Sequence, residues 1–337
     1  MSGVPVDPEA VRRPGPGPHD TVERTPPVPE GGARRTTSTA VTRPDGPDGR
    51  VVIELGGRDV VRETDGTTHI VDEIAGRVGD DGAATAAWSE IDGGRTVAPD
   101  IVGLPLAWGW GRALADLLPA ERTLLASVLE DLGGAFLVSG YAPLRSGLIT
   151  TPPELAAEMA DGQADVCLGW ARGGDLVTML ATTGQNPVPQ GPAASTDVLA
   201  GWHPMPEPPP HTVRRLRRLD VAPDDDGLAV QSHFRDSYVP PDPGEPEMVM
   251  HEYLIDARVD SERRLADITV EPRVLPWRSC PGAIHSAQQL VGVSIADLDV
   301  RARTELRGPT TCTHLTSTMR SMADVACLAA AEPRGEP

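Results

Sequence analysis

Aromatic residues are scarce in this chain of 337 residues, where Phe, Trp and Tyr together make up 3%. Proteins that bind single-stranded nucleic acid stack the bases on aromatic side chains, and few are present here. Positive charge is also in deficit, because 30 Lys and Arg face 49 Asp and Glu and leave a formal net charge of −19. Such a surface repels phosphate backbones, so the composition predicts no nucleic-acid partner.

Long apolar runs are missing as well. No stretch reaches the length of a membrane span, and the start of the chain lacks the basic and apolar regions of a signal peptide. We therefore expect a cytoplasmic protein with no membrane partner. Cysteine is limited to four residues, Cys167, Cys280, Cys312 and Cys327. In a reducing compartment these are expected to be thiols or metal ligands rather than disulfides.

Proline and glycine are abundant, at 35 residues each, and they divide the chain. Residues 1–33 have no periodic apolar pattern, which predicts a disordered tail. Residues 185–210 contain "QNPVPQGPAAS" and "HPMPEPPP", which predict a Pro-rich linker. Two larger segments remain, residues 34–184 and residues 211–330. The 39% apolar content of the whole chain is enough to bury a sizeable core.

The two larger segments share motifs in the same order. The first pairs are "ARRTTSTAVTRPDG" with "VRRLRRLDVAPDDDG" and "GGRDVV" with "HFRDSY"; the later pairs are "AGRVGDDG" with "DARVDSER" and "IVGLPLA" with "LVGVSIA". Four matches in one order favour internal duplication. Asp72 stands near the place of His251, so the N-terminal copy is predicted to be degenerate, and Cys167 is placed in an extra β-hairpin of that copy.

The C-terminal copy has the clearest periodicity. Strict alternation over residues 248–259 predicts a strand that places His251 on an apolar face, and residues 227–236 and 264–274 predict its neighbours. Helical patterns follow, and the last one carries an apolar stripe formed by Leu315, Met319, Met322 and Ala326. Strands followed by helices predict an α+β fold: two tandem divergent copies of an antiparallel sheet with helices packed on one face.

Two cysteines of this copy stand where helices are predicted to begin. Pro281 follows Cys280, and Thr311 precedes Cys312, and both contexts are typical of helix N-termini, where a thiolate is favoured. If these helices cover the inward face of the sheet, His251 meets both sulfurs. A set of two sulfurs and two nitrogens suits Zn²⁺. The predicted metal ligands are His251, Cys280, Cys312 and His314.

Nucleophilic catalysis is an alternative. Cys312 or Cys280 would attack a carbonyl, and His314, His251 or His285 would act as the base. Cys312 and His314 are expected to form a poor dyad because residues so close on a helix do not face each other, which favours a pair from different elements. In a third interpretation the cysteines only pack in the core and His251 is a hydrogen-bonded core histidine.

Four arginines form the run "RRLRR". Arg214, Arg215, Arg217 and Arg218 are a candidate cofactor site, since guanidinium groups bind the phosphate or carboxylate of an acyl-thioester cofactor through two contacts. The alternative is a solvated strand edge whose arginines pair with the acidic run 224–226. In "FRDSY", Arg235 and Asp236 alternate and are expected on opposite faces of their strand.

A resemblance rests on "HTVRR", "DGL", "HEYLIDARVD", "CPGA" and "CTHL", in that order. Residues 211–330 resemble the bacterial family called domain of unknown function 2889, and "RRTTSTAVTRPDG" with "CLGWARGG" resembles its longer actinobacterial form. Thr311 stands where this family commonly has Gly. A more distant likeness, to the iron-sulfur scaffold fold, implies a metal site at His251, Cys280 and Cys312.

These observations lead to a functional expectation. The chain is expected to be a metal-dependent enzyme using Zn²⁺ or a thiol-dependent enzyme, a hydrolase or lyase of catabolism. The small-molecule substrate is expected to be an organic acid or an acyl-thioester. A non-catalytic metal-binding or scaffold protein, and a structural fold without metal, are the alternatives.

Overall fold

The fold is that of a computed structural model. It describes residues 17–91, 100–106, 109–115, 117, 122–149, 151–186 and 188–331. Residues 1–16 of the expected tail lie outside the described residues.

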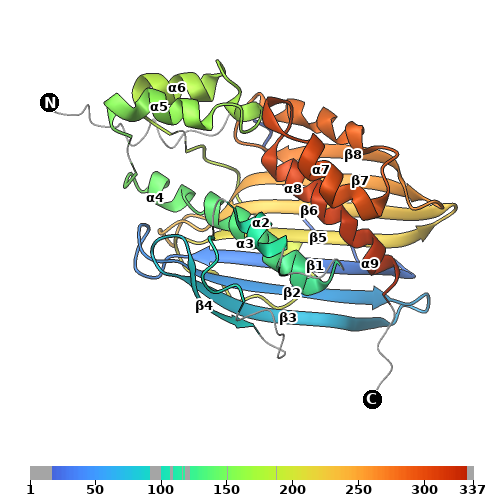
Figure 1. The fold of residues 1–337 in the computed structure, drawn as a ribbon. Helices are drawn as coiled ribbons and strands as arrows, with labels where there is room; N and C mark the ends of the chain where they lie inside the picture. The colour runs from blue at the N-terminus through green and yellow to red at the C-terminus, as the bar shows by residue number, and fades with distance from the viewer. Residues whose placement is uncertain are drawn as a thin grey trace.

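Eight antiparallel strands form one sheet, in the order β4-β3-β2-β1-β5-β6-β7-β8 (Figure 1). The N-terminal strands are β1 (Gly32–Thr42), β2 (Val52–Arg62), β3 (Thr68–Asp80) and β4 (Ala86–Ile91). The C-terminal strands are β5 (Val213–Asp224), β6 (Gly227–Tyr238), β7 (Met248–Asp260) and β8 (Leu265–Val274). The predicted α+β class with an antiparallel sheet is confirmed. Pairing of β1 with β5 merges the two four-stranded halves into a single sheet, where separate sheets were expected.

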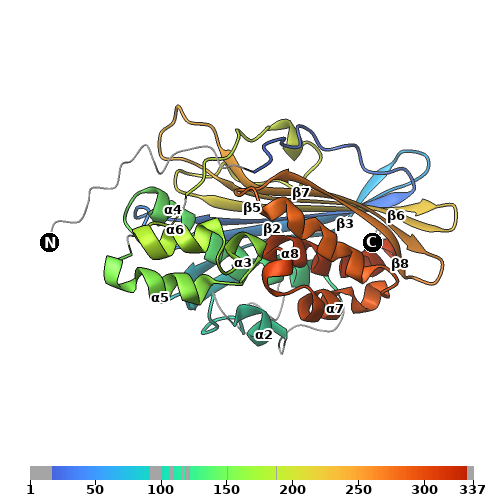
Figure 2. The same ribbon diagram turned by 90° about the horizontal axis from the view of Figure 1, so that it is seen from above.

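The helices cover one face of this sheet (Figure 2). Those after β4 are α2 (Trp110–Ala115), α3 (Leu124–Val138), α4 (Tyr141–Arg145), α5 (Pro153–Gln163), α6 (Asp175–Thr183) and the short 3₁₀ helix η1 (Leu168–Trp170). A further 3₁₀ helix, η2 (Asp197–Leu199), lies on the opposite face, where the Thr25 hydroxyl donates to Val198 O. Those after β8 are η3 (Cys280–Leu290), η4 (Ile295–Asp297), α7 (Leu298–Glu305), η5 (Gly308–Thr310), α8 (Thr313–Ser321), η6 (Met322–Asp324) and α9 (Val325–Ala329). One apolar cluster joins α2 and α3 to the N-terminal strands, and a second joins η3, α7 and α8 to the C-terminal strands.

The other face of the sheet is covered by extended chain. His19 forms a β-bridge with Val274, and Trp202 Nε1 donates to Thr25 Oγ1 at 3.1 Å. The ring of His203 contacts the hydroxyl groups of two residues of β1 at 2.8 and 2.9 Å. Residues 17–33 thus make defined contacts although a disordered tail was expected, because strand side chains and backbone supply the hydrogen bonds that their own sequence pattern does not predict.

Two local predictions were wrong. The segment around Cys167, expected to be an extra β-hairpin, lies between α5 and α6 and forms the turn of η1. The C-terminal amphipathic pattern, expected to form one helix, is divided into α8, η6 and α9. Its stripe nevertheless faces the sheet, since Leu315, Met319 and Met322 are fully buried.

One helical stretch, Leu124–Arg145, has the length and hydropathy of a membrane span, although no apolar run of that length was expected. It spans α3 and α4, and 61% of its most apolar window is buried inside the protein. A mostly buried apolar helix is what the core of a soluble protein contains, and α3 packs directly on β1 and β2.

Candidate thiol and imidazole site

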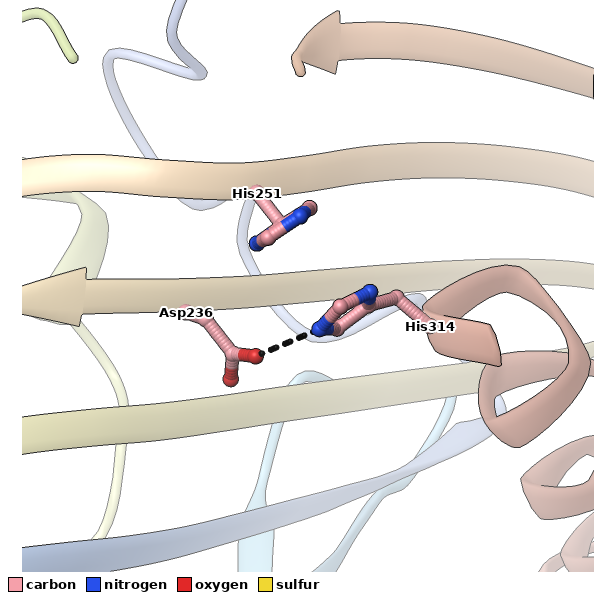
Figure 3. A group of neighbouring side chains, drawn as sticks. All are labelled: Asp236, His251 and His314. Carbon is pink, nitrogen blue, oxygen red and sulfur yellow. Dashed lines mark ion pairs between the residues drawn. The ribbon is translucent and has the colours of Figure 1, made fainter. Parts of the chain in front are cut away.

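Three elements bring a carboxylate and two imidazoles together on the helix-covered face. Asp236 comes from β6, His251 from the neighbouring β7, and His314 from the first turn of α8 (Figure 3). Asp236 pairs with His251 in the register of the two strands, so both side chains leave the sheet on the same face. Their ligand atoms and those of His314 all lie within 4.8 Å of one another.

Cys312 contacts His314 directly. Its Sγ atom lies 3.7 Å from His314 Nδ1. The expectation that these two side chains do not face each other was wrong, because Cys312 is not in helical conformation. It is the N-cap residue of α8, with φ −120° and ψ 132°, and this extended backbone turns its side chain toward the first helical turn.

The second nitrogen of His314 faces Asp236. His314 Nε2 lies 3.3 Å from Asp236 Oδ2, the contact drawn as a dashed line in Figure 3. Asp236 is fully buried, and Arg215 of β5 donates from Nε and Nη2 to its two oxygens at 2.8 Å each. The Cys312 sulfur, the His314 imidazole and the Asp236 carboxylate thus contact one another in series, and the Arg215 guanidinium group holds the carboxylate in place.

His251 stacks on His314. The ring centroids are 3.8 Å apart and the planes meet at 18°. Burial, followed by the positive charges of His314 and Arg215, lowers the pKa of His251 well below its ordinary value. Its Nδ1 atom is buried and has no hydrogen-bond partner among the described residues. A neutral ring therefore lies flat against the ring of His314.

The protonation states of Cys312 and His314 depend on each other. Burial alone would lower the pKa of His314, but Asp236 and Cys312 outweigh it and raise the pKa to about 9. Burial alone would raise the pKa of Cys312, but His314, the Tyr253 hydroxyl and the Leu315 amide lower it. The site therefore favours a thiolate beside an imidazolium, the charge state of an activated cysteine nucleophile.

Cys280 differs from Cys312 in its electrostatics. Both open helices as predicted, but burial and the neighbouring Cys312 and Cys167 raise the pKa of Cys280 to about 12. The prediction of a thiolate at both helix starts was therefore wrong for Cys280. It lacks the imidazole that Cys312 has, and η3 is a 3₁₀ helix, whose hydrogen-bond geometry is poorer than that of an α-helix.

The predicted four-ligand metal set is only partly assembled. Among the described residues, the metal-type group that gathers is Asp236, His251 and His314, and neither Cys280 nor Cys312 belongs to it. The carboxylate of Asp236 was missed at the sequence level. The third candidate base, His285, lies exposed on η3, and the indole of Trp277 packs against the C-terminal apolar cluster.

The four arginines of "RRLRR" do not form a solvated edge, because β5 lies in the middle of the sheet. All four are buried and paired, on the helix-covered face with Asp131 and Asp236 and on the other face with Glu247 and Asp220. The expected partners at 224–226 are not used by them. Because protein carboxylates already hold these guanidinium groups, a cofactor would have to displace an ion pair to reach them.

Two further residues at the site were missed. Tyr253, two positions after His251, shares its face and places a buried hydroxyl beside Cys312. Cys167, for which no role at the site was expected, lies near Cys280, because both sulfurs border Gly169. The alternation of β7 could have identified Tyr253. The alternation of β6 correctly placed Asp236 and Arg235 on opposite faces, and Arg235 donates a hydrogen bond to Glu252 on the other face.

Comparison with known proteins gives a family for one part of the chain. Searches of curated proteins and of solved structures found no match, so the likeness to the iron-sulfur scaffold fold is not supported. A protein-family model described as "Protein of unknown function (DUF2889)" matches residues 213–328, from β5 to α9. These residues supply Cys312, His314, Asp236 and His251, so the region that matches the DUF2889 model contains the whole candidate site.

Proposed function

We propose that the protein is a thiol-dependent hydrolase or acyltransferase whose nucleophile is Cys312. The observation that carries the proposal is the chain from Cys312 Sγ to His314 Nδ1, at 3.7 Å, and from His314 Nε2 to Asp236, at 3.3 Å. A nucleophile, a base and a carboxylate that orients the base are the three parts of a catalytic triad, which is recognised by geometry rather than by sequence order.

In this mechanism the Cys312 thiolate attacks the acyl carbon of an ester or thioester. His314, protonated at rest, gives its proton to the leaving group, and the acyl group stays on sulfur. Water then attacks the acyl carbon while His314 takes the water proton, and the carbon–sulfur bond breaks. This step releases the carboxylic acid and restores the Cys312 thiolate beside a protonated His314. Asp236 holds His314 and stabilises its positive charge, and Arg215 keeps Asp236 in place.

The start of α8 adds stabilisation for negative charge. The first backbone amides of a helix have no acceptor within it, and the helix dipole favours an anion there. The Leu315 amide already contributes to lowering the pKa of Cys312. Amides in such a position can also stabilise the oxyanion of a tetrahedral intermediate.

Access to the sulfur requires movement. Cys312 is 6% exposed, and η1 packs against the chain just before it, where the Leu168 amide donates to Thr311 O at 2.8 Å. We propose that η1 moves aside when substrate binds. Of the expected substrates, an organic acid or an acyl-thioester, this mechanism favours the acyl-thioester and adds small esters, because thiolates accept the acyl groups of both.

The test uses p-nitrophenyl acetate as a generic acyl donor and intact mass as the readout. The full chain should gain one acetyl group, mapped to Cys312, and release nitrophenolate in a burst. Cys312→Ser should lose the burst, and His314→Gln should slow it by at least tenfold. Cys327→Ser, which changes an exposed cysteine, is the matched control. In this variant Cys312 should be acetylated as in the unmodified protein. Absence of acetyl on Cys312 in the unmodified protein would refute the proposal.

A metal-dependent function is the second candidate. Two imidazoles and one carboxylate suit a divalent transition metal, and the unpartnered Nδ1 of His251 is a free donor atom. Asp236, His251 and His314 would hold a Zn²⁺ ion, which polarises a carbonyl or activates water when bound. The two candidates exclude each other at one atom, because His314 Nε2 binds a metal only after losing the proton that it shares with Asp236.

Elemental analysis separates the candidates. Near-stoichiometric zinc in the purified protein that His251→Gln removes would favour the metal. Metal-free protein whose Cys312 is acetylated would favour the thiol enzyme. His211→Gln is a suitable control, since His211 contacts Tyr238 away from the site.

We also propose a cytoplasmic location and descent of the two halves from one duplicated unit. Arg35 holds Asp59 through two contacts as Arg215 holds Asp236, and Asp59 pairs with Asp72 as Asp236 pairs with His251. These equivalences support a degenerate N-terminal copy that lacks the second imidazole.

A further inference from the structure

The N-terminal half of the chain reaches the candidate site through α3. Ser127, Asp131 and Gly134 follow one another at spacings of four and three residues, so they share the face of α3 that meets the sheet. Asp131 and Gly134 lie against Arg215 of β5. Both precede the region that the family model matches, residues 213–328. The site thus has contacts with a part of the chain outside that region.

Arg215 is held from two sides. Its Nε and Nη2 atoms donate to Asp236, and its third nitrogen, Nη1, lies 3.6 Å from Asp131 Oδ1. A Cβ atom at Gly134 would overlap Nη1, so the guanidinium group fills the room that this glycine leaves. The position from which Arg215 holds Asp236 therefore depends on α3.

Asp131 is connected to His314 by a second route, through Arg217. Arg217 Nε donates to Asp131 Oδ2 at 2.6 Å, and Arg217 Nη2 donates to Asp131 Oδ1 at 2.8 Å. The same Nη2 atom donates to Ser317 Oγ at 2.8 Å. Ser317 lies in α8, whose first turn carries His314. Asp131 thus supports the imidazole through α8 as well as the carboxylate through Arg215.

Two guanidinium groups meet at Asp131. Their central carbon atoms, in Arg215 and Arg217, lie 5.1 and 4.7 Å from the centroid of the same ring, that of Phe234. Like charges this close repel strongly in a buried site, because little water screens them. Asp131 is itself buried and supplies a negative charge to both groups. Replacing it by a neutral amide should therefore drive the two groups apart and move Arg215 relative to Asp236.

The other half of the sheet has the matching contact in reverse. Arg35 holds Asp59 in the N-terminal half, and Arg35 Nη1 lies 3.1 Å from Asp324 Oδ2, which comes from η6 of the C-terminal half. Each buried Arg–Asp pair thus takes a second carboxylate from the helices of the opposite half. The pair of Arg215 leads to an imidazole, whereas Asp59 stands opposite Asp72.

We propose that Asp131 is a positioning residue of the candidate site, so that the N-terminal half completes the site of the C-terminal half. The proposal rests on the proposed function, because the group that Asp131 positions is His314, the base of that mechanism. Asp131 acts through the two guanidinium groups that it holds: one of them orients Asp236, and the other anchors α8.

The test measures the nitrophenolate burst of the full chain with p-nitrophenyl acetate. Asp131→Asn should slow the burst by about tenfold, because a small misplacement of the base lowers reactivity strongly. Asp131→Glu keeps the carboxylate, and a small cavity beside Asp131 and Ser317 has room for its longer side chain, so it should restore most of the rate. Asp324→Asn is the matched control, since it also removes the second carboxylate of a buried arginine, and its rate should stay within about twofold of the unmodified protein.

A double variant separates positioning from a general loss of structure. His314→Gln removes the group that Asp131 positions, so adding Asp131→Asn to it should slow the burst no further. Slowing of equal size in both backgrounds would overturn the proposal, because Asp131 would then act without His314. Gly134→Ala is a second variant for the case in which Asp131→Asn does not fold. Its methyl group displaces Arg215 Nη1, so it should also slow the burst, and an unchanged rate would count against the proposal.

The ring of His314 gives a readout that does not require acyl transfer. In protein with isotope-labelled histidine, the nitrogen NMR signals of His314 are identified by their loss in His314→Gln. They should shift in Asp131→Asn and keep their positions in Asp324→Asn. A protein that never acetylates but shows this shift loses the proposed function and keeps Asp131 as the residue that positions His314. A protein that acetylates equally fast with Asp131→Asn, and whose His314 signals stay in place, keeps the proposed function and loses the positioning role.

Discussion

Arg215 donates to both carboxylate oxygens of Asp236, at 2.8 Å each, and the same two-point ion pair recurs between Arg35 and Asp59 in the other half of the sheet. Both pairs are buried on the helix-covered face. The difference lies in what the carboxylate meets next. Asp236 faces His314, whereas Asp59 stands opposite Asp72 in the register of β2 and β3. The molecule thus contains an internal control for its own site.

This control separates structural from catalytic effects of a buried carboxylate. Asp236→Asn and Asp59→Asn each remove one carboxylate from a buried guanidinium group that keeps a second one, because Arg215 lies 3.6 Å from Asp131 and Arg35 lies 3.1 Å from Asp324. Each substitution should therefore cost at most about 3–5 kcal/mol of unfolding free energy. Only Asp236→Asn removes the orienting group of His314. We expect urea unfolding to show losses of similar size, and iodoacetamide labelling of Cys312 to slow markedly in Asp236→Asn alone. Equal labelling of both variants would remove Asp236 from the site.

Tyr253 is expected to tune the thiol. Its buried hydroxyl helps to lower the pKa of the neighbouring Cys312 and has no hydrogen-bond partner among the described residues. Tyr253→Phe should therefore raise the pKa of Cys312 and move the pH–rate profile of its alkylation to higher pH, with a stability change within about 1 kcal/mol. Tyr238→Phe, another fully buried tyrosine, is the control and should leave the profile in place.

Gly169 is expected to be intolerant of any side chain. The backbone of η1 approaches Cys280 Sγ so closely that an added methyl group would lie 3.0 Å from it, so Gly169→Ala must displace η1 or the thiol. We expect a loss of about 1–3 kcal/mol in urea unfolding. Gly162→Ala in α5 meets nothing within 4 Å and removes glycine from a helix, so it should be neutral or stabilising by up to about 1 kcal/mol.

Periodicity predicted the C-terminal strands well, because alternation is a local property. It placed His251 on the inward face and put Arg235 and Asp236 on opposite faces. It could not predict that β1 and β5 pair, because that contact joins residues about 180 positions apart. For the same reason it could not predict that β5 is central, so the arginines of "RRLRR" were considered as a solvated edge. Cys312 was predicted beside a helix start, but its contact with His314 depends on the extended backbone of a cap residue, which spacing does not reveal.

The pH dependence of stability gives the last prediction. Because the pKa of His314 rises from 6.5 to about 9 on folding, the folded protein keeps a proton there that the unfolded chain has lost. This contribution is complete below pH 6.5 and disappears as the pH rises through 9, so the free energy of unfolding should fall across this interval by up to about 3 kcal/mol. Cys312 acts in the opposite direction, since its lowered pKa stabilises the fold at high pH and loses that effect as the pH falls. Cys312→Ser removes this opposing contribution while Asp236 still raises the pKa of His314. The free energy of unfolding of that variant should therefore decline as the pH rises above 6.5, over a narrower interval because Cys312 no longer helps to raise the pKa of His314. The decline should be absent when His314→Gln is added. A double variant that kept the decline would assign it to another group.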